Sequence, residues 1–196
     1  MSHKIEELKK LIPSAIYMAK DSNGSLEPSL FTESSEKDGY IVLSQPVTHE
    51  TKTCKPEDVI SLEVLYHKYI DKDEDGSAKD IHVFSVKAPS YLASKLHFPF
   101  GEVEYVSVPF MSFETSEVEF LSEKWHEVMK NTILSSISNI DIKRLVSYPE
   151  DKELDGMAIA SPFILKTKNS DKAINIDAFN GYIFYQSLEH VPFTVD

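Results

Sequence analysis

The ten residues DKDEDGSAKD, from Asp71 to Asp80, come closer than any other segment of this chain to a metal-binding motif. Asp71, Asp73 and Asp75 alternate and are followed by a glycine, as at positions 1, 3, 5 and 6 of an EF-hand loop. Calcium prefers several oxygen ligands, and alternate aspartates on a turning chain supply them. Position 12, however, is His82 where an EF-hand has a bidentate glutamate. A calcium site in this segment would use Asp71, Asp73, Asp75 and Asp80.

An acidic turn is the simpler interpretation of the same segment. Its flanks, residues 59–70 and 81–88, are rich in β-branched and aromatic residues with partial alternation, which predicts two strands and not the helices of an EF-hand. A turn at Asp75 and Gly76 would then join them as a hairpin. We therefore favour a solvated hairpin tip, with calcium as the alternative and no other cofactor expected.

A second group with chemical capacity is His49, Glu50 and Cys54. A thiol nucleophile needs a base within hydrogen-bond reach and a third group that orients the base, and these three residues supply the types. The spacing matches no cysteine-hydrolase signature, and a single cysteine is more often a small packing residue. A hydrolase that uses Cys54 with His49, or a metal-assisted enzyme that uses the Asp71 loop, is the alternative function.

Glutamates gather between Glu102 and Glu127, where Lys124 is the one basic residue. A row of acids beside aromatic residues suits the docking of a basic protein surface, because opposite charge speeds association. A solvated face is the competing interpretation, and for Glu102 and Glu104, which alternate along a predicted strand, it is the preferred one. The residues predicted to bind a cationic protein partner are Glu114, Glu117, Glu119, Glu123 and Glu127.

The composition excludes several classes of function. The formal net charge is −12, and Arg144 is the single arginine among 20 basic residues, which argues against nucleic-acid binding. The six glycines are widely separated, so the chain has no Walker A loop, no dinucleotide-binding GxGxxG and no GxSxG nucleophile elbow. No apolar run reaches membrane-spanning length, and no signal segment precedes the first polar residues. We expect a cytoplasmic protein without membrane contact.

The elements that would position these residues follow from hydrophobic spacing. Residues 5–12 predict a short amphipathic helix, and residues 15–32 predict two strands around a turn. Strands are also expected at residues 40–47, 102–110, 140–149, 157–168 and 172–187. One long helix is expected from about Ser116 to Ile137, with Ser116 and Glu119 as a capping box. The fold class is α+β: a mostly antiparallel sheet with two helices, in a single domain of residues 1–196 that has a potential division into two lobes near 111–115.

Three finer expectations complete the prediction. The polar segments 33–39 and 48–58 are expected to be connections without regular structure. The long helix is expected to bury one stripe, formed by Val118, Leu121, Trp125, Val128, Met129, Thr132 and Ile133. His67 and His82 are candidates to face each other across the hairpin.

These observations favour a small acidic binding protein that engages a cationic protein, as an inhibitor or an immunity-type protein does. The second hypothesis is the hydrolase or metal-assisted enzyme, and the third is a calcium-binding module at Asp71–Asp80.

Overall fold

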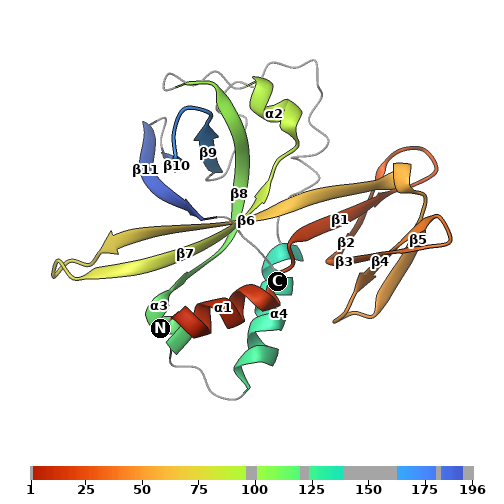
Figure 1. Ribbon diagram of the computed structural model, residues 1–196, viewed down its shortest axis with the longest axis horizontal. Helices are drawn as coiled ribbons and strands as arrows, with labels where there is room; N and C mark the ends of the chain where they lie inside the picture. Colours follow the sequence, from red (N-terminus) through yellow and green to blue (C-terminus); the bar gives the residue numbers. More distant parts are fainter. Residues whose placement is uncertain (1, 96–100, 120–123, 139–162, 180–181, 192–196) are drawn as a thin grey trace.

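The computed structural model describes residues 2–95, 101–119, 124–138, 163–179 and 182–191 (Figure 1). Every strand pairing in this part of the chain is antiparallel. A few helices lie beside the sheets, so the predicted α+β class is confirmed. The strand predicted at 140–149 lies outside the described residues.

The N-terminal elements form as their spacing predicts. Helix α1 (Ser2–Leu11) buries Ile5 and Leu8, which lie one turn apart on its inner face. Strands β1 (Ala15–Lys20) and β2 (Leu26–Phe31) then pair as a hairpin. The Asp21 carboxylate closes its turn by accepting hydrogen bonds from the backbone N–H groups of Asn23 and Ser25.

The remaining strands of the large sheet form a closed barrel. They are β6 (Val59–Lys72), β7 (Ala78–Lys87), β8 (Val103–Glu114), β9 (Phe163–Thr167), β10 (Lys172–Phe179) and β11 (Tyr182–Val191). Each pairs with the next, and β11 also pairs with β6, so the six strands return on themselves. Nothing in the hydrophobic pattern indicated this closure, because it joins segments far apart in sequence.

Strand β6 changes neighbour along its length. Val59–Glu63 pairs with β1, whereas Tyr66–Lys68 pairs with β11. Beyond Lys68, its pairing partner within the described ranges is β7, and in the same ranges β7 pairs with β8 only from Ile81 onward. Residues 69–80 therefore form a two-stranded ribbon that projects from the barrel, which we call the β-arm (Figure 1).

Two segments predicted to be irregular are strands. Strands β3 (Glu33–Lys37) and β5 (Glu50–Cys54) pair with the two edges of β4 (Tyr40–Gln45). The three strands form a separate sheet. Both are edge strands, and β3 is exposed along its whole length, so neither has the apolar alternation that marks a half-buried strand. Their pairing with the apolar β4 determines their structure instead.

The predicted long helix is two helices. Helix α3 (Thr115–Glu119) and helix α4 (Trp125–Ser138) are separate elements, and Lys124 between them lies in a turn. The Glu117 carboxylate accepts a hydrogen bond of 2.8 Å from the backbone N–H of Glu114, so the cap lies two residues before the one predicted at Ser116.

The buried stripe of these helices is partly as predicted. Val118, Trp125, Met129 and Ile133 are buried, whereas the Val128 side chain is 57% exposed. Thr132 is also exposed, and its hydroxyl donates to the Val128 carbonyl within the helix. The face of α4 that packs on the sheet is therefore narrower than the predicted stripe.

The main core lies between the helices and one face of the sheet. Leu8 of α1 and Ile133 of α4 pack with Ile16, Val64 and Phe84 from the strands. Helix α2 (Ser90–Lys95) covers another part of the barrel through Ala93, and η1 (Pro56–Asp58) leads into β6. No helix in the described ranges is long and apolar enough to cross a membrane.

Candidate functional site

The turn of the β-arm is held by its own polar groups. The Asp73 and Gly76 backbones close it, through bonds from Asp73 N–H to the Ser77 carbonyl and from Gly76 N–H to the Asp73 carbonyl. Ser77 lowers the pKa of the Asp75 carboxyl, most through its side-chain hydroxyl and next through its backbone N–H, which donates to the carboxylate at 2.8 Å. Gly76 has φ +83°, a conformation that glycine adopts without strain. The predicted hairpin with its acidic tip is therefore present.

Lys79 joins this tip to the end of β8. Its Nζ lies 2.8 Å from a carboxylate oxygen of Asp73 and 2.8 Å from one of Glu114. The two acids raise the pKa of Lys79, Asp73 more than Glu114, and Lys79 in turn lowers the pKa of Asp73. The contact forms because Ile81 of β7 lies opposite Glu114 of β8, which places Glu114 beside the base of the β-arm.

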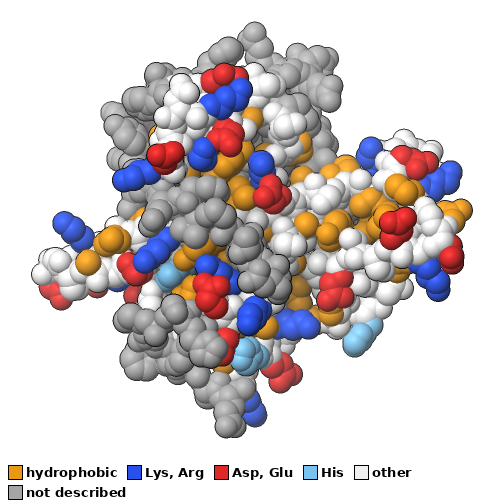
Figure 2. Space-filling model, in the orientation of Figure 1, with side chains coloured by type: hydrophobic (Ala, Val, Ile, Leu, Met, Phe, Trp, Pro, Cys, Tyr) orange, Lys and Arg blue, Asp and Glu red, His pale blue; other side chains and the backbone are white. Residues whose placement is uncertain are grey.

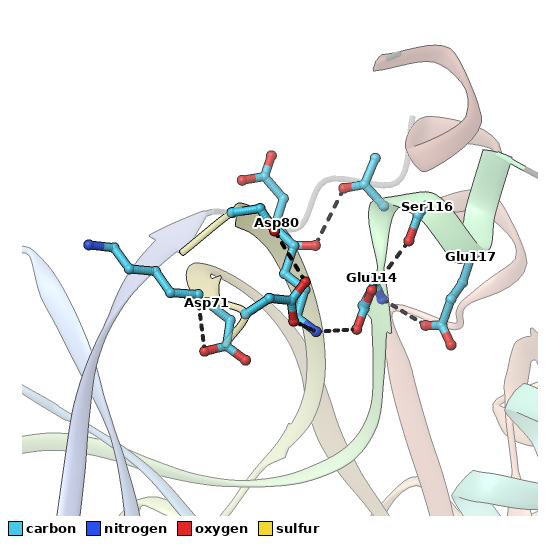
Figure 3. Close-up of polar contacts among 10 residues, drawn as sticks. Asp71, Asp80, Glu114, Ser116 and Glu117 are labelled. Atoms are coloured by element: carbon cyan, nitrogen blue, oxygen red, sulfur yellow. Dashed lines mark hydrogen bonds and ion pairs between the residues drawn. The ribbon is translucent and has the colours of Figure 1, made fainter. Parts of the chain in front are cut away.

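The structure thus brings together two acidic segments that are separate in sequence. We call their common surface the acidic face. Its carboxylates are close together in Figure 3, and acidic side chains lie at the end of the projecting β-arm in Figure 2. It contains the basic residues Lys68, Lys72 and Lys79. Its acidic residues are Asp71, Asp73, Glu74, Asp75, Asp80, Glu114 and Glu117. The acids outnumber the lysines, so the face carries an excess of negative charge.

The other predicted partner-binding residues are placed differently. Glu119 ends α3, and its side chain is outside the described part of the structure, as is the whole of Glu123. Glu127 is exposed on α4. Of the five glutamates predicted to bind a partner, Glu114 and Glu117 are therefore the two that the structure places in the acidic face.

The aspartates proposed as calcium ligands each have a polar partner within the protein. Asp73 is bound by Lys79, Asp75 accepts from the turn, and Asp80 forms an ion pair with Lys68 at 2.8 Å. Asp71 accepts a hydrogen bond from the Lys72 backbone N–H. Within the described residues, no cluster of three or more His, Cys, Asp or Glu side chains has the arrangement of a metal site. In the structure, lysines, the turn and the backbone contact these carboxylates. A calcium site at Asp71, Asp73, Asp75 and Asp80 stays a prediction.

The predicted nucleophile and base are also apart. Cys54 ends β5 and is buried against Ala19 and Phe31, whereas His49 precedes the strand and is exposed. They are five steps apart along an extended chain, which spans about 17 Å at roughly 3.4 Å per residue. Burial raises the pKa of the Cys54 thiol, which disfavours the reactive thiolate. At this distance the His49 ring cannot take the proton of the Cys54 thiol, as a hydrolase that uses the two residues would require.

A cavity of about 290 Å³ lies elsewhere, between the end of α1, α4 and the start of β3. Its lining includes Lys10, Pro13, Glu33, Lys130 and Leu134. It contains neither Cys54, His49 nor the β-arm, so it does not complete either enzyme hypothesis.

The two hairpin histidines lie on opposite faces of the sheet, in contrast to the prediction that they face each other. His82 is opposite Lys68 in the register of β6 and β7, and His67 is opposite Val83. Successive side chains of a strand point to opposite faces, so the one-residue offset separates the two rings.

His82 belongs to a buried polar chain that the sequence did not indicate. Its Nδ1 lies 2.6 Å from the Tyr66 hydroxyl, and its Nε2 lies 2.7 Å from the Thr115 hydroxyl. Thr115 also donates to the Asp80 carbonyl at 3.5 Å. This chain connects the base of the β-arm with the first residue of α3. The sequence analysis assigned no role to Lys79 or Thr115. Counting along the hairpin would have placed Lys79 opposite Asp71, whereas no local signal in the sequence pairs His82 with Thr115.

Burial is the main influence on His82. The ring is 4% exposed, and its desolvation lowers the pKa; Lys68 and Lys9 lower it further, while Asp80 acts in the opposite direction. Lys9 of α1 lies over the Tyr66 ring, 4.3 Å from its centroid. The neutral imidazole is therefore the form that this site accommodates.

Comparison with protein-family models, with curated protein sequences and with solved structures gives no match for this chain.

Proposed function

We propose that this protein is a binding protein whose acidic face engages a cationic protein partner, in the manner of an inhibitor or an immunity-type protein. The observation that supports the proposal most is the position of Lys79 between Asp73 and Glu114, which joins the β-arm and the β8–α3 junction in one surface. A single continuous acidic surface attracts a basic partner more strongly than two isolated patches do.

The extent of the acidic face suits electrostatic steering. Exposed charges interact over about 8 Å at physiological ionic strength, so neighbouring carboxylates on one face add their fields. Complementary fields of this kind raise association rates and suppress partners of the wrong charge. The overall net charge of −12 acts in the same direction.

The β-arm also offers an apolar contact. Ile70 is 62% exposed and lies directly before Asp71. Protein interfaces commonly contain a central apolar anchor surrounded by charged residues that exclude water. Ile70 lies opposite Asp80 in the register and on the same side of β6 as Lys68 and Lys72, so charged residues surround it, and we assign it the role of anchor.

The experiment compares two double charge reversals that change the net charge equally. Asp71→Lys with Glu74→Lys alters the acidic face, and Glu36→Lys with Glu57→Lys alters exposed acids on β3 and η1. Each variant and the parent protein are immobilised, incubated with extract of the source cells at two salt concentrations, and the retained proteins are identified by mass spectrometry.

A basic protein that the parent and the Glu36/Glu57 variant retain, and that the Asp71/Glu74 variant loses, supports the proposal. Its retention should weaken at the higher salt concentration. Equal retention by both variants, or retention of no basic protein, contradicts the proposal. Ile70→Ser should weaken the same retention without changing its dependence on salt.

A further inference from the structure

The polar chain through His82 assigns one tautomer to the ring. Thr115 donates its hydroxyl proton to the Asp80 carbonyl, so it accepts from His82 Nε2–H. Nδ1 then lacks a proton and accepts the Tyr66 hydroxyl proton across 2.6 Å. Every donor in this chain meets an acceptor while the imidazole is neutral.

A second proton on the ring, at Nδ1, is unfavourable in this site. It would turn Nδ1 from an acceptor into a donor, so the Tyr66 hydroxyl would have to accept where it now donates, and it would place a cation at a residue that is 4% exposed. Lys68 of β6 lies opposite His82 in the register, and Lys9 of α1 lies over Tyr66. Both add repulsion.

The acids around the ring are already engaged with cations or backbone. Asp80 of β7 is paired with Lys68, and Glu6 of α1 with Lys9 at 3.0 Å. At the β8–α3 junction, Glu114 is paired with Lys79, and Glu117 accepts from the Glu114 backbone. None of these carboxylates contacts the ring in the described residues, so a cationic ring gains little compensation.

Water reaches the ring from the α3 side. Tyr66, at the Nδ1 end, is 3% exposed, whereas Thr115, at the Nε2 end, is half-buried. Helix α3 has five residues and too few internal hydrogen bonds to be stable alone, so its position depends on contacts such as His82–Thr115 and buried Val118. Hydration of a protonated His82 therefore requires α3 to move away from the sheet.

We propose that His82 is an acid-sensitive latch that holds α3 against the sheet and releases it when the ring is protonated. Release would move Glu117 and free the Glu114 backbone, so mild acid would reshape the acidic face. The effect on the latch is a property of the free protein; its effect on partner binding rests on the proposed function.

Linkage between proton binding to His82 and the opening of α3 gives the direction and the size of the pH effect. The closed state holds the ring neutral, and the open state exposes it to water, where its pKa returns to about 6.5. Protons therefore favour the open state as the pH falls below 6.5. Between pH 7.5 and pH 5.5 the population with α3 open should rise by up to about tenfold.

Amide hydrogen exchange of the free protein tests the latch. The Glu114 amide donates to the Glu117 carboxylate while α3 is closed. After correction for intrinsic exchange rates, this amide should open up to about tenfold more at pH 5.5 than at pH 7.5, while the amides of β4 stay unchanged. His82→Gln keeps hydrogen-bonding groups but does not titrate, so its α3 should open equally at both pH values. His126→Gln removes an exposed histidine of α4 and should retain the parent response.

Equal opening of α3 at both pH values in the parent protein, or a pH response that persists in His82→Gln, overturns the latch. If His82→Gln does not fold, an NMR titration of the His82 ring in the parent protein decides: a pKa at or above 6.5 overturns the proposal. Failure of the latch leaves the retention experiment on Asp71 and Glu74 unaffected, and failure of that experiment leaves the exchange result unaffected, so the two proposals are tested separately.

Discussion

The two ends of β8 use the same residue types with different results. Near its start, Glu102 and Glu104 each form an ion pair with a lysine at β9 or just beyond it, Lys168 and Lys166. Near its end, Glu114 shares Lys79 with Asp73. The first end is balanced one to one, whereas the second has more acid than base. We call them the paired end and the acidic end.

The comparison shows that local charge depends on register more than on composition. All of these glutamates belong to one acidic run of the sequence. Their neighbours across the sheet differ: β9 brings lysines to one end, and the β-arm brings further aspartates to the other. The two ends also contain different buried titratable groups, Tyr105 at the paired end and His82 opposite Phe113 at the acidic end.

Loss of the Tyr66 hydroxyl should give the largest effect, because the acidic end depends on a buried polar chain. Tyr66→Phe leaves His82 Nδ1 buried without its donor, which should lower the free energy of unfolding by about 1–3 kcal/mol. Urea denaturation at pH 7.5 measures the change. Tyr69→Phe, on the same hairpin but less buried, is the control and should change stability by less than about 0.5 kcal/mol. Equal losses in the two variants would remove the special role of the chain.

Alkaline pH should act on the paired end next. Burial raises the pKa of Tyr105, and the Glu104 charge raises it further. The folded state thus keeps its proton more firmly than the unfolded state, and the stabilisation that is complete below pH 10 is lost as the pH rises above it. The loss should approach about 1.4 kcal/mol per pH unit above 10. Denaturation of the parent and Tyr105→Phe between pH 9 and 11 measures it; parallel curves would show that Tyr105 is not responsible.

Removal of one lysine from each end should give the smallest effect and the sharpest contrast. Lys79→Met leaves two carboxylates without their shared cation, so the pKa of Asp73 should rise toward its ordinary value of 3.8. Lys166→Met removes the partner of Glu104 and should leave the pKa of Asp73 unchanged. NMR titration of the side-chain carboxyl carbons distinguishes the two; an identical response in both variants would mean that Lys79 does not connect the β-arm to β8.

The elements with their own local signal could be predicted from the sequence. The hairpin around Asp75 and Gly76 follows from two apolar strands and a turn dipeptide, and α1 follows from the spacing of Ile5 and Leu8. The acidic tip belongs to the same local signal. In each case the residues that determine the element lie within the element.

The elements that depend on partners distant in the sequence could not be predicted from the sequence. Strands β3 and β5 are polar edges that acquire their structure from β4, and the barrel closes through β11, which only the fold brings to β6. The contact between His82 and Thr115 spans 33 residues. The acidic face itself was predicted as two patches, since the register that places Glu114 beside the β-arm is a tertiary property.

The shared strand β6 has a consequence for the chain during its synthesis. The edge that β11 covers, at Tyr66–Lys68, lies roughly 120 residues before its partner, so at about 5–20 residues per second it waits on the order of ten seconds. An uncovered strand edge can pair with another nascent chain, and charged side chains discourage such pairing. Lys68 lies on this edge, and Asp71 and Lys72 follow three and four residues later. These charged side chains of the folded surface therefore also reduce aggregation at β6 until β11 emerges from the ribosome.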